Sequence, residues 1–142
     1  MQIPAIHVNS EIGRLKKVML HRPGQELENL MPEYLEQLLF DDIPYLKVAQ
    51  QEHDCFADIL RKNGVEVIYY VDEVARALDR PEIKDRFIRE MLDQTRFSSR
   101  GVREAIYAYL IAMNPHQLVG KVIAGIRKTE LTDYRPRTLA EK

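Results

Sequence analysis

The sequence predicts an α/β unit followed by a cluster of short helices. Two short segments, 18–20 and 65–71, are dense in apolar, β-branched or aromatic residues and favour strands. A segment with helical periodicity, 44–62, lies between them. A strand, a helix and a second strand joined by a short turn place both strands in one sheet, with the helix on one face.

The first strand is predicted within LKKVMLHRP, where an apolar run ends at Pro23-Gly24. The helix is expected to begin at Pro44 and to stop at Asn63-Gly64, a pair that favours a left-handed helix end. Its apolar positions are Leu46, Ala49, Phe56, Ile59 and Leu60. The second strand is then VEVIYYV, residues 65–71.

Beyond residue 72 the apolar residues recur only at helical spacing. Asp79 is expected to cap a helix that has Pro81 in its first turn, with Glu82 completing a capping box. A further stripe, 102–113, ends at Asn114-Pro115, and the same pair is expected to cap the next helix. We therefore divide the chain into an α/β segment, 1–72, a helical subdomain, 73–131, and a loosely ordered tail, 132–142.

The amino-acid composition argues against nucleic acid and membranes as partners. The 142 residues include 21 basic and 22 acidic side chains spread along the chain, so no summed field attracts nucleic acid or an anionic membrane. No segment approaches the roughly 18 apolar residues that span a bilayer, and the N-terminus does not resemble a secretory signal. We expect a soluble cytoplasmic protein without nucleic-acid or membrane partners.

Histidine and cysteine supply no obvious catalytic or metal site. His7, His21, His53 and His116 lack metal-ligand spacing, and we interpret His53 as half-buried and hydrogen-bonded. Cys55 is the only cysteine, so it forms no internal disulfide. Its position in mid-helix favours a small buried apolar residue over a nucleophile.

The motif LLFDDIP, residues 38–44, leaves two interpretations open. Asp41 and Asp42 precede a predicted helix start, where the helix dipole favours negative charge. A helix start accounts for one aspartate but not for the second, nor for the apolar residues before them. Apolar surface beside fixed anions is also the kind of surface that accepts a cation with a hydrophobic stem, such as arginine or lysine.

Two strands and one helix do not make a complete sheet protein. Only residues 3–8 remain as a further candidate strand, and a two-stranded sheet needs cover for its edges and its second face. Either the helices of 73–128 cap the sheet, or the chain is a piece of something larger.

Three runs then carry a resemblance to a known family. SEIGRLKKVMLHRPGQELENL, LLFDDIPYL and EHDCFADILRKNGVEVIYY resemble, in order and spacing, the opening of bacterial arginine deiminases, members of the guanidino-modifying superfamily. The helical stretch that ends in AGIRKTEL resembles the α-helical insertion of that subfamily. The likeness covers roughly residues 3–131.

The resemblance implies part of a five-bladed α/β propeller, with one blade segment and an all-helical insertion in this chain. It implies a hydrolase that converts L-arginine to L-citrulline and ammonia. In the family a cysteine thiolate attacks the guanidinium carbon, a histidine moves protons and two carboxylates hold the guanidinium. No metal or organic cofactor is implied.

The family's nucleophile, histidine and paired acids belong to parts that this chain does not match. Cys55 does not align with the nucleophile, and Asp41 and Asp42 are not the paired acids. What carries over is a substrate contact through the Leu39 carbonyl, with Phe40 and the two aspartates shaping that loop. We expect this chain alone to be inactive and to need the remaining C-terminal part of the enzyme.

Other readings stay open. Dimethylarginine hydrolysis, agmatine deimination and amidino transfer share the fold and nucleophile, and a non-catalytic binding or assembly module is an alternative of another class. Unpaired strand edges and exposed helices also predict self-association into a homo-oligomer.

Overall fold

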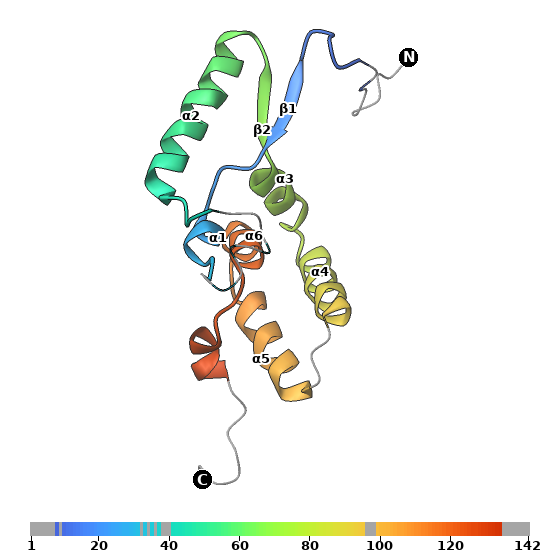
Figure 1. Ribbon diagram of the computed structural model, residues 1–142. Helices are drawn as coiled ribbons and strands as arrows, with labels where there is room; N and C mark the ends of the chain where they lie inside the picture. Colours follow the sequence, from blue (N-terminus) through green and yellow to red (C-terminus); the bar gives the residue numbers. More distant parts are fainter. Residues whose placement is uncertain are drawn as a thin grey trace, which may run out of the picture.

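The computed structural model describes residues 8, 10–31, 33, 35, 37, 41–95 and 99–134, with the backbone alone for 132–134. The candidate strand at 3–8 lies almost wholly outside the described residues, as does the tail from 135 onward. The described part has an α/β unit at one end and a helical subdomain at the other (Figure 1).

The predicted strand, helix and strand are confirmed. β1 (Lys17–Leu20) and β2 (Glu66–Tyr69) form a two-stranded parallel sheet, and α2 (Leu46–Lys62) connects them and packs against β2. Lys17 lies opposite Glu66 in the register, and Lys17 Nζ is 2.9 Å from Glu66 Oε1. Gly64 ends the helix as predicted, with φ of 77°, a value that residues with a Cβ rarely adopt.

Two predicted boundaries in this unit are wrong. α2 begins at Leu46 and not at Pro44, because Tyr45 has extended backbone angles. The second strand stops at Tyr69, and Tyr70 opens helix α3 (Tyr70–Ala77). Packing decided the second case: Val71, Val74 and Ala75 have helical spacing and all contact the core of the helical subdomain.

The helical subdomain contains α3, α4 (Pro81–Gln94), α5 (Arg100–Ile111), α6 (Pro115–Ala124) and a 3-10 helix, η2 (Lys128–Tyr134). Asn114 caps α6 as predicted: its Oδ1 accepts from the Gln117 N–H at 2.9 Å, and the Gln117 side chain accepts from the Asn114 N–H. η2 continues to Tyr134, so residues 132–134, which were expected in the loosely ordered tail, are helical, and Leu131 of η2 packs on the core.

The capping box at Asp79 is wrong. Pro81 is the first residue of α4, so the cap position falls to Arg80, whose side chain makes no capping bond. Lys84 supplies a link of another kind, donating to the carbonyl oxygens of Ile111, at 2.7 Å, and Met113. A lysine from α4 thereby satisfies carbonyl groups at the end of α5.

The hydrophobic core lies in the helical subdomain. Its buried members come from α3 to α6 and the turn after α3: Ala75, Leu78, Ile88, Leu92, Ile106, Leu110, Leu118 and Val119. Among the described residues of the α/β unit, only Ala57 and Val65 are buried apolar side chains. The helical subdomain therefore has a buried apolar core, whereas the described α/β unit has few buried apolar side chains. Whether the α/β unit is a propeller blade stays a prediction.

Candidate functional site

The predicted substrate loop is described only at its second half. Leu39 and Phe40 lie outside the described residues. Asp41 and Asp42 are exposed and lie between α1 (Gln25–Glu28) and α2. Asp42 Oδ1 accepts a hydrogen bond from the Ile43 N–H at 2.7 Å. This local bond agrees with a loop-shaping role for Asp42, and the site assignment itself stays a prediction.

The chain that leads from β1 toward this loop is attached to α2. We call residues 21–29 the connecting segment. Arg22 donates from Nε and Nη2 to the two carboxylate oxygens of Asp54, each at 2.8 Å. Gln50 Nε2 donates to the Pro23 carbonyl oxygen at 2.9 Å. Two successive residues of the connecting segment are thus fixed to one face of the helix.

The contact between Arg22 and Asp54 favours the charged form of both side chains. The Arg22 hydrogen bonds lower the pKa of Asp54 below its usual value, and the same contact raises the pKa of Arg22. Both side chains are about half exposed. The pair therefore serves mainly to orient the segment, because exposed ion pairs add little free energy of folding.

A second set of bonds shapes the turn that follows β1. Glu26 Oε1 accepts from the Gly24 N–H at 2.7 Å and lies 2.8 Å from His21 Nε2. Burial alone raises the pKa of Glu26, but its hydrogen bonds to His21 and to backbone N–H groups outweigh burial and leave that pKa lowered. The carboxylate form of Glu26 thus holds the turn that begins α1.

At its far end the connecting segment reaches the helical subdomain. Asn29 Nδ2 donates to the Ala124 carbonyl oxygen at 2.6 Å, and Arg127 Nη2 donates to Asn29 Oδ1. Ala124 is the last residue of α6, so Asn29 satisfies a carbonyl that lacks a partner within its helix. The connecting segment is fixed to α2 on one side and to α6 on the other.

The connecting segment begins at the carboxyl edge of the sheet. The connecting segment starts where β1 ends, and α3 starts where β2 ends. The carboxyl ends of parallel strands meet at one edge of a sheet, and crevices at that edge are where ligands of α/β proteins commonly bind.

Cys55 differs from its predicted environment. It is exposed on α2 and is not a buried apolar residue. The prediction was wrong because α2 has more apolar surface than a two-stranded sheet covers. His53 is half-buried as predicted, with its ring centroid 5.8 Å from that of Tyr69. Its Nε2 is buried without a hydrogen-bond partner among the described residues, so the predicted hydrogen bond is not found there.

The described residues hold no cluster of three or more His, Cys, Asp or Glu side chains that could bind a metal ion. Nor are the residues singled out above brought into one group. Cys55 lies on α2, Asp41 and Asp42 precede that helix, and His21 follows β1. Within the described chain they do not assemble a catalytic centre.

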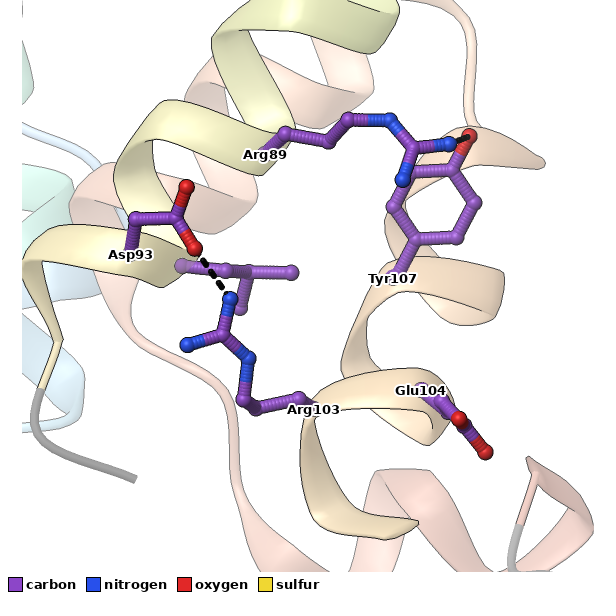
Figure 2. A pocket seen from close by; sticks show the side chains of 6 residues that line it. Arg89, Asp93, Arg103, Glu104 and Tyr107 are labelled. Atoms are coloured by element: carbon purple, nitrogen blue, oxygen red, sulfur yellow. Dashed lines mark hydrogen bonds and ion pairs between the residues drawn. The ribbon is translucent and has the colours of Figure 1, made fainter. Parts of the chain in front are cut away.

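A hollow of about 270 Å³ lies between α4 and α5 (Figure 2). It is lined by Arg89, Leu92, Asp93, Arg103, Glu104 and Tyr107. Figure 2 shows Arg103 and Asp93 pointing toward each other across it, and they form an ion pair. The Arg89 guanidinium carbon lies 4.6 Å from the centroid of the Tyr107 ring.

The charges around this hollow are already paired. Arg89 donates to both carboxylate oxygens of Asp85, Tyr107 donates its hydroxyl hydrogen to Asp85, and Glu104 Oε1 lies 2.7 Å from Arg100 Nε. Each charged side chain that lines the hollow among the described residues has a partner of opposite charge, so we interpret the hollow as a seam between helices.

None of these long-range contacts was predicted from the sequence. Arg22 and Asp54 are 32 residues apart, and Asn29 and Arg127 are 98 apart. Arginine and asparagine occur throughout the chain, and a single sequence contains no signal that selects these pairs from the many possible ones.

The fold and these contacts define an α/β chain that positions a loop beside a helical subdomain, without a catalytic cluster in its described residues. A family model described as arginine deiminase matches residues 36–142. The chain belongs to the arginine deiminase family.

Curated relatives agree. The chain is 54% identical over 134 residues to an arginine deiminase of Streptococcus gordonii. The alignment covers 94% of this chain and 33% of that relative. It is 47% identical over 131 residues to that of Limosilactobacillus fermentum, covering 92% and 32%. It is 53% identical over 129 residues to an arginine deiminase of Streptococcus pyogenes, and that alignment covers 90% of this chain and 31% of the relative. The chain thus spans about a third of the length of these relatives.

Among the described residues, no helix is both long and apolar enough to cross a membrane.

Proposed function

We propose that this chain forms the N-terminal third of an arginine deiminase, an enzyme that hydrolyses L-arginine to L-citrulline and ammonia. The observation that carries the proposal is the identity of 47–54% to proteins of that name over at least 90% of the chain. Identity at this level over this length is compatible with retention of the same local structure and the same loop.

In this proposal the chain supplies one wall of the substrate pocket and not the reacting groups. The Leu39 carbonyl contacts the α-amino group of arginine, and Phe40, Asp41 and Asp42 shape the loop. The attachment of the connecting segment through Arg22 and Asn29 supports this role, because it fixes the chain on which the loop depends. Nucleophilic attack on the guanidinium carbon is the task of residues in the remaining two thirds.

The test is citrulline formation. The purified 142-residue chain is expected to produce no citrulline from L-arginine. A single polypeptide joining residues 1–142 to the C-terminal two thirds of the Streptococcus gordonii enzyme is expected to produce it. Agmatine and dimethylarginine serve as competing substrates, and preference for either one would replace arginine deimination by a sister activity.

Turnover by the isolated chain would contradict the assignment of the reacting groups to the rest of the enzyme. An inactive joined polypeptide with a folded N-terminal third would contradict the proposed function and favour the assembly module. The predicted fold of the whole, a five-bladed α/β propeller, is part of the same proposal.

We also propose that the isolated chain self-associates. Its sheet has unpaired strand edges among the described residues, and Met19 is 52% exposed. Sedimentation at roughly tens of micromolar is expected to show species larger than the monomer. A stable monomer at that concentration would contradict this.

A further inference from the structure

We propose that Glu130, in the helical subdomain, is a positioning residue for the connecting segment. We call residues 124–131, which run from the end of α6 into η2, the strap. Glu130 fixes the strap to α5 and α6, and Arg127 of the strap binds Asn29. Through this link the helical subdomain sets the affinity for arginine in the complete enzyme. The effect on arginine rests on the proposed function, whereas the link itself does not.

The first end of the strap is bonded to the connecting segment. The Ala124 carbonyl oxygen accepts from Asn29 Nδ2 at 2.6 Å, and Arg127 Nη2 donates to Asn29 Oδ1. α1 ends at Asn29 and packs beside α6, as Figure 1 shows. The oxygen and nitrogen of one planar amide make these two bonds. Both bonds therefore persist only while the strap keeps Arg127 in place relative to the end of α6.

The other end of the strap is held by Glu130. Its Oε2 accepts from the hydroxyl of Tyr109, on α5, at 2.7 Å and lies 2.9 Å from Nζ of Lys121, on α6. One carboxylate oxygen thus joins two helices to η2. The Lys121 and Glu130 side chains are only 23% and 25% exposed, so water and salt screen this pair less than they screen a fully exposed pair.

The charged form of Glu130 is the form that holds the strap. Hydrogen bonds from Lys121 and from Tyr109 keep the pKa of Glu130 below its usual value, although burial acts to raise it. A hydrogen bond from the backbone N–H of Arg127 also lowers this pKa. The carboxylate therefore restrains the same residue whose side chain binds Asn29.

Apolar contacts press the strap against the core but do not set its position. Ile126 and Leu131 pack on the hydrophobic core of the helical subdomain. Burial of apolar surface is non-directional, whereas hydrogen bonds have narrow limits of distance and angle. We therefore assign the position of the strap to the bonds of Glu130. The printed bonds of Glu130 all go to the helical subdomain, so its effect on the connecting segment is indirect.

The link bears on arginine because of where the connecting segment leads. Residues 30–45 join α1 to α2 and include Asp41 and Asp42. When Asn29 is released, this part of the chain has more freedom before substrate binds. Ordering it on binding then costs affinity. The chemical step is unaffected in this proposal, because the reacting groups belong to the remaining two thirds.

The link is tested in the 142-residue chain by limited proteolysis with a glutamate-specific protease at low protein concentration. Mass spectrometry identifies each cut. Cleavage after Glu28, in α1, reports release of the connecting segment, and cleavage after Glu90, in α4, reports general unfolding. Glu130→Gln keeps the shape of the side chain and removes its charge. Glu104→Gln is the matched control, because Glu104 pairs with Arg100 within α5.

We expect Glu130→Gln to speed cleavage after Glu28 by about fivefold, the factor that one hydrogen bond is typically worth, with cleavage after Glu90 unchanged. Lys121→Gln should act in the same direction and serves as the second variant if Glu130→Gln does not fold. The control should leave both rates unchanged. An unchanged rate after Glu28, or equal acceleration at both cleavage sites, would overturn the inference.

A double variant tests whether Glu130 acts through Asn29. Asn29→Ala should also speed cleavage after Glu28. Asn29→Ala combined with Glu130→Gln should be no faster than the faster single variant, because both changes break one link. Effects that multiply in the double variant would overturn the inference, since they would show that the two residues act independently.

The consequence for arginine is tested in the joined polypeptide described above. Glu130→Gln should raise KM for L-arginine several-fold while kcat changes by less than about twofold, and Glu104→Gln should change neither. A purely structural role gives another result. Partial unfolding lowers the amount of active enzyme, so it lowers the apparent kcat at unchanged KM, and that outcome would overturn the positioning role.

The two measurements separate this inference from the proposed function. An inactive joined polypeptide, with selectively faster cleavage after Glu28 in Glu130→Gln, would refute the proposed function and support the link. An active joined polypeptide whose KM does not respond to Glu130→Gln would refute the inference alone.

Discussion

Asn29 is hydrogen-bonded to the end of α6, which lies 95 residues further along the chain. Its amide nitrogen donates to the Ala124 carbonyl at 2.6 Å, and its amide oxygen accepts from Arg127. One side chain thus joins the connecting segment to the point where the helical subdomain ends. This contact links the two parts of the chain directly.

Asn29→Ala should lower the free energy of unfolding by about 1–2 kcal/mol, because two hydrogen bonds are lost and a helix-end carbonyl loses its partner. Urea unfolding measures the change. Hydrogen exchange should accelerate in the last turn of α6. Asn63→Ala is the control, since the Asn63 side chain donates to the Ile59 carbonyl oxygen, within the end of α2. Equal acceleration in α6 for both variants would contradict the link.

Acid should destabilise the chain in part through Asp54. The Arg22 hydrogen bonds lower the pKa of Asp54 in the folded protein, so the unfolded chain binds a proton there at higher pH. The stabilisation is therefore complete above the unfolded pKa of about 4 and is lost as pH falls through the lower folded value.

Asp54→Asn removes this titration and should flatten the fall in stability on acidification, as measured by urea unfolding at a series of pH values. Asp58→Asn is the control. Asp58 also pairs with an arginine, Arg61, but within one turn of α2. The hypothesis fails if the pH dependence of stability is the same in Asp54→Asn and in the unmodified chain.

Two glycines should respond to alanine with opposite signs. Gly64 has φ of 77°, so Gly64→Ala is expected to destabilise by about 1–2 kcal/mol. Gly120 lies inside α6, and a Cβ there would meet no atom within 4 Å. Gly120→Ala is expected to stabilise by about 0.5–1 kcal/mol. Thermal or urea unfolding of both variants checks the pair, and a shift of the same sign in both would contradict it.

Asp42→Ala in the complete enzyme should raise KM for L-arginine several-fold while kcat changes by less than about twofold, because the loop orients substrate and takes no part in bond breaking. Steady-state citrulline formation measures both constants. Asp58→Ala, an exposed change on α2, is the control. A collapse of kcat at unchanged KM would assign Asp42 to the chemical step and refute the loop-shaping role.

Local sequence signals predicted the elements of this fold but not all their boundaries. Asn63-Gly64 and Asn114-Pro115 marked a helix end and a helix start correctly, because backbone conformation and capping depend on neighbouring residues. Tyr70 was predicted as strand and is helical, because packing on the helical core outweighs the preference of an aromatic residue for strands. Asp79 was predicted as the cap of α4, but Pro81 is the first residue of that helix, so the cap position falls to Arg80.

The candidate site was predictable only as a stretch of chain. The residue pattern singled out LLFDDIP, and the resemblance added a predicted substrate contact. The attachment of the connecting segment was not predicted, since it depends on residues brought together from α2 and α6. The exposure of Cys55 also could not be predicted. Helical periodicity marks an apolar face, but it does not say whether a neighbour covers that face.

The sequence by itself determined the order of strand, helix and strand, the helical subdomain and the resemblance to arginine deiminases, because these depend on residue spacing along the chain. Only the tertiary structure decided that the core belongs to the helical subdomain and that, among the described residues, Phe56 and Ile59 of α2 stay exposed. It also decided that Asn29 meets α6. The physical reason is that burial and long-range hydrogen bonds depend on which surfaces meet, and one chain's periodicity defines surfaces without defining their partners.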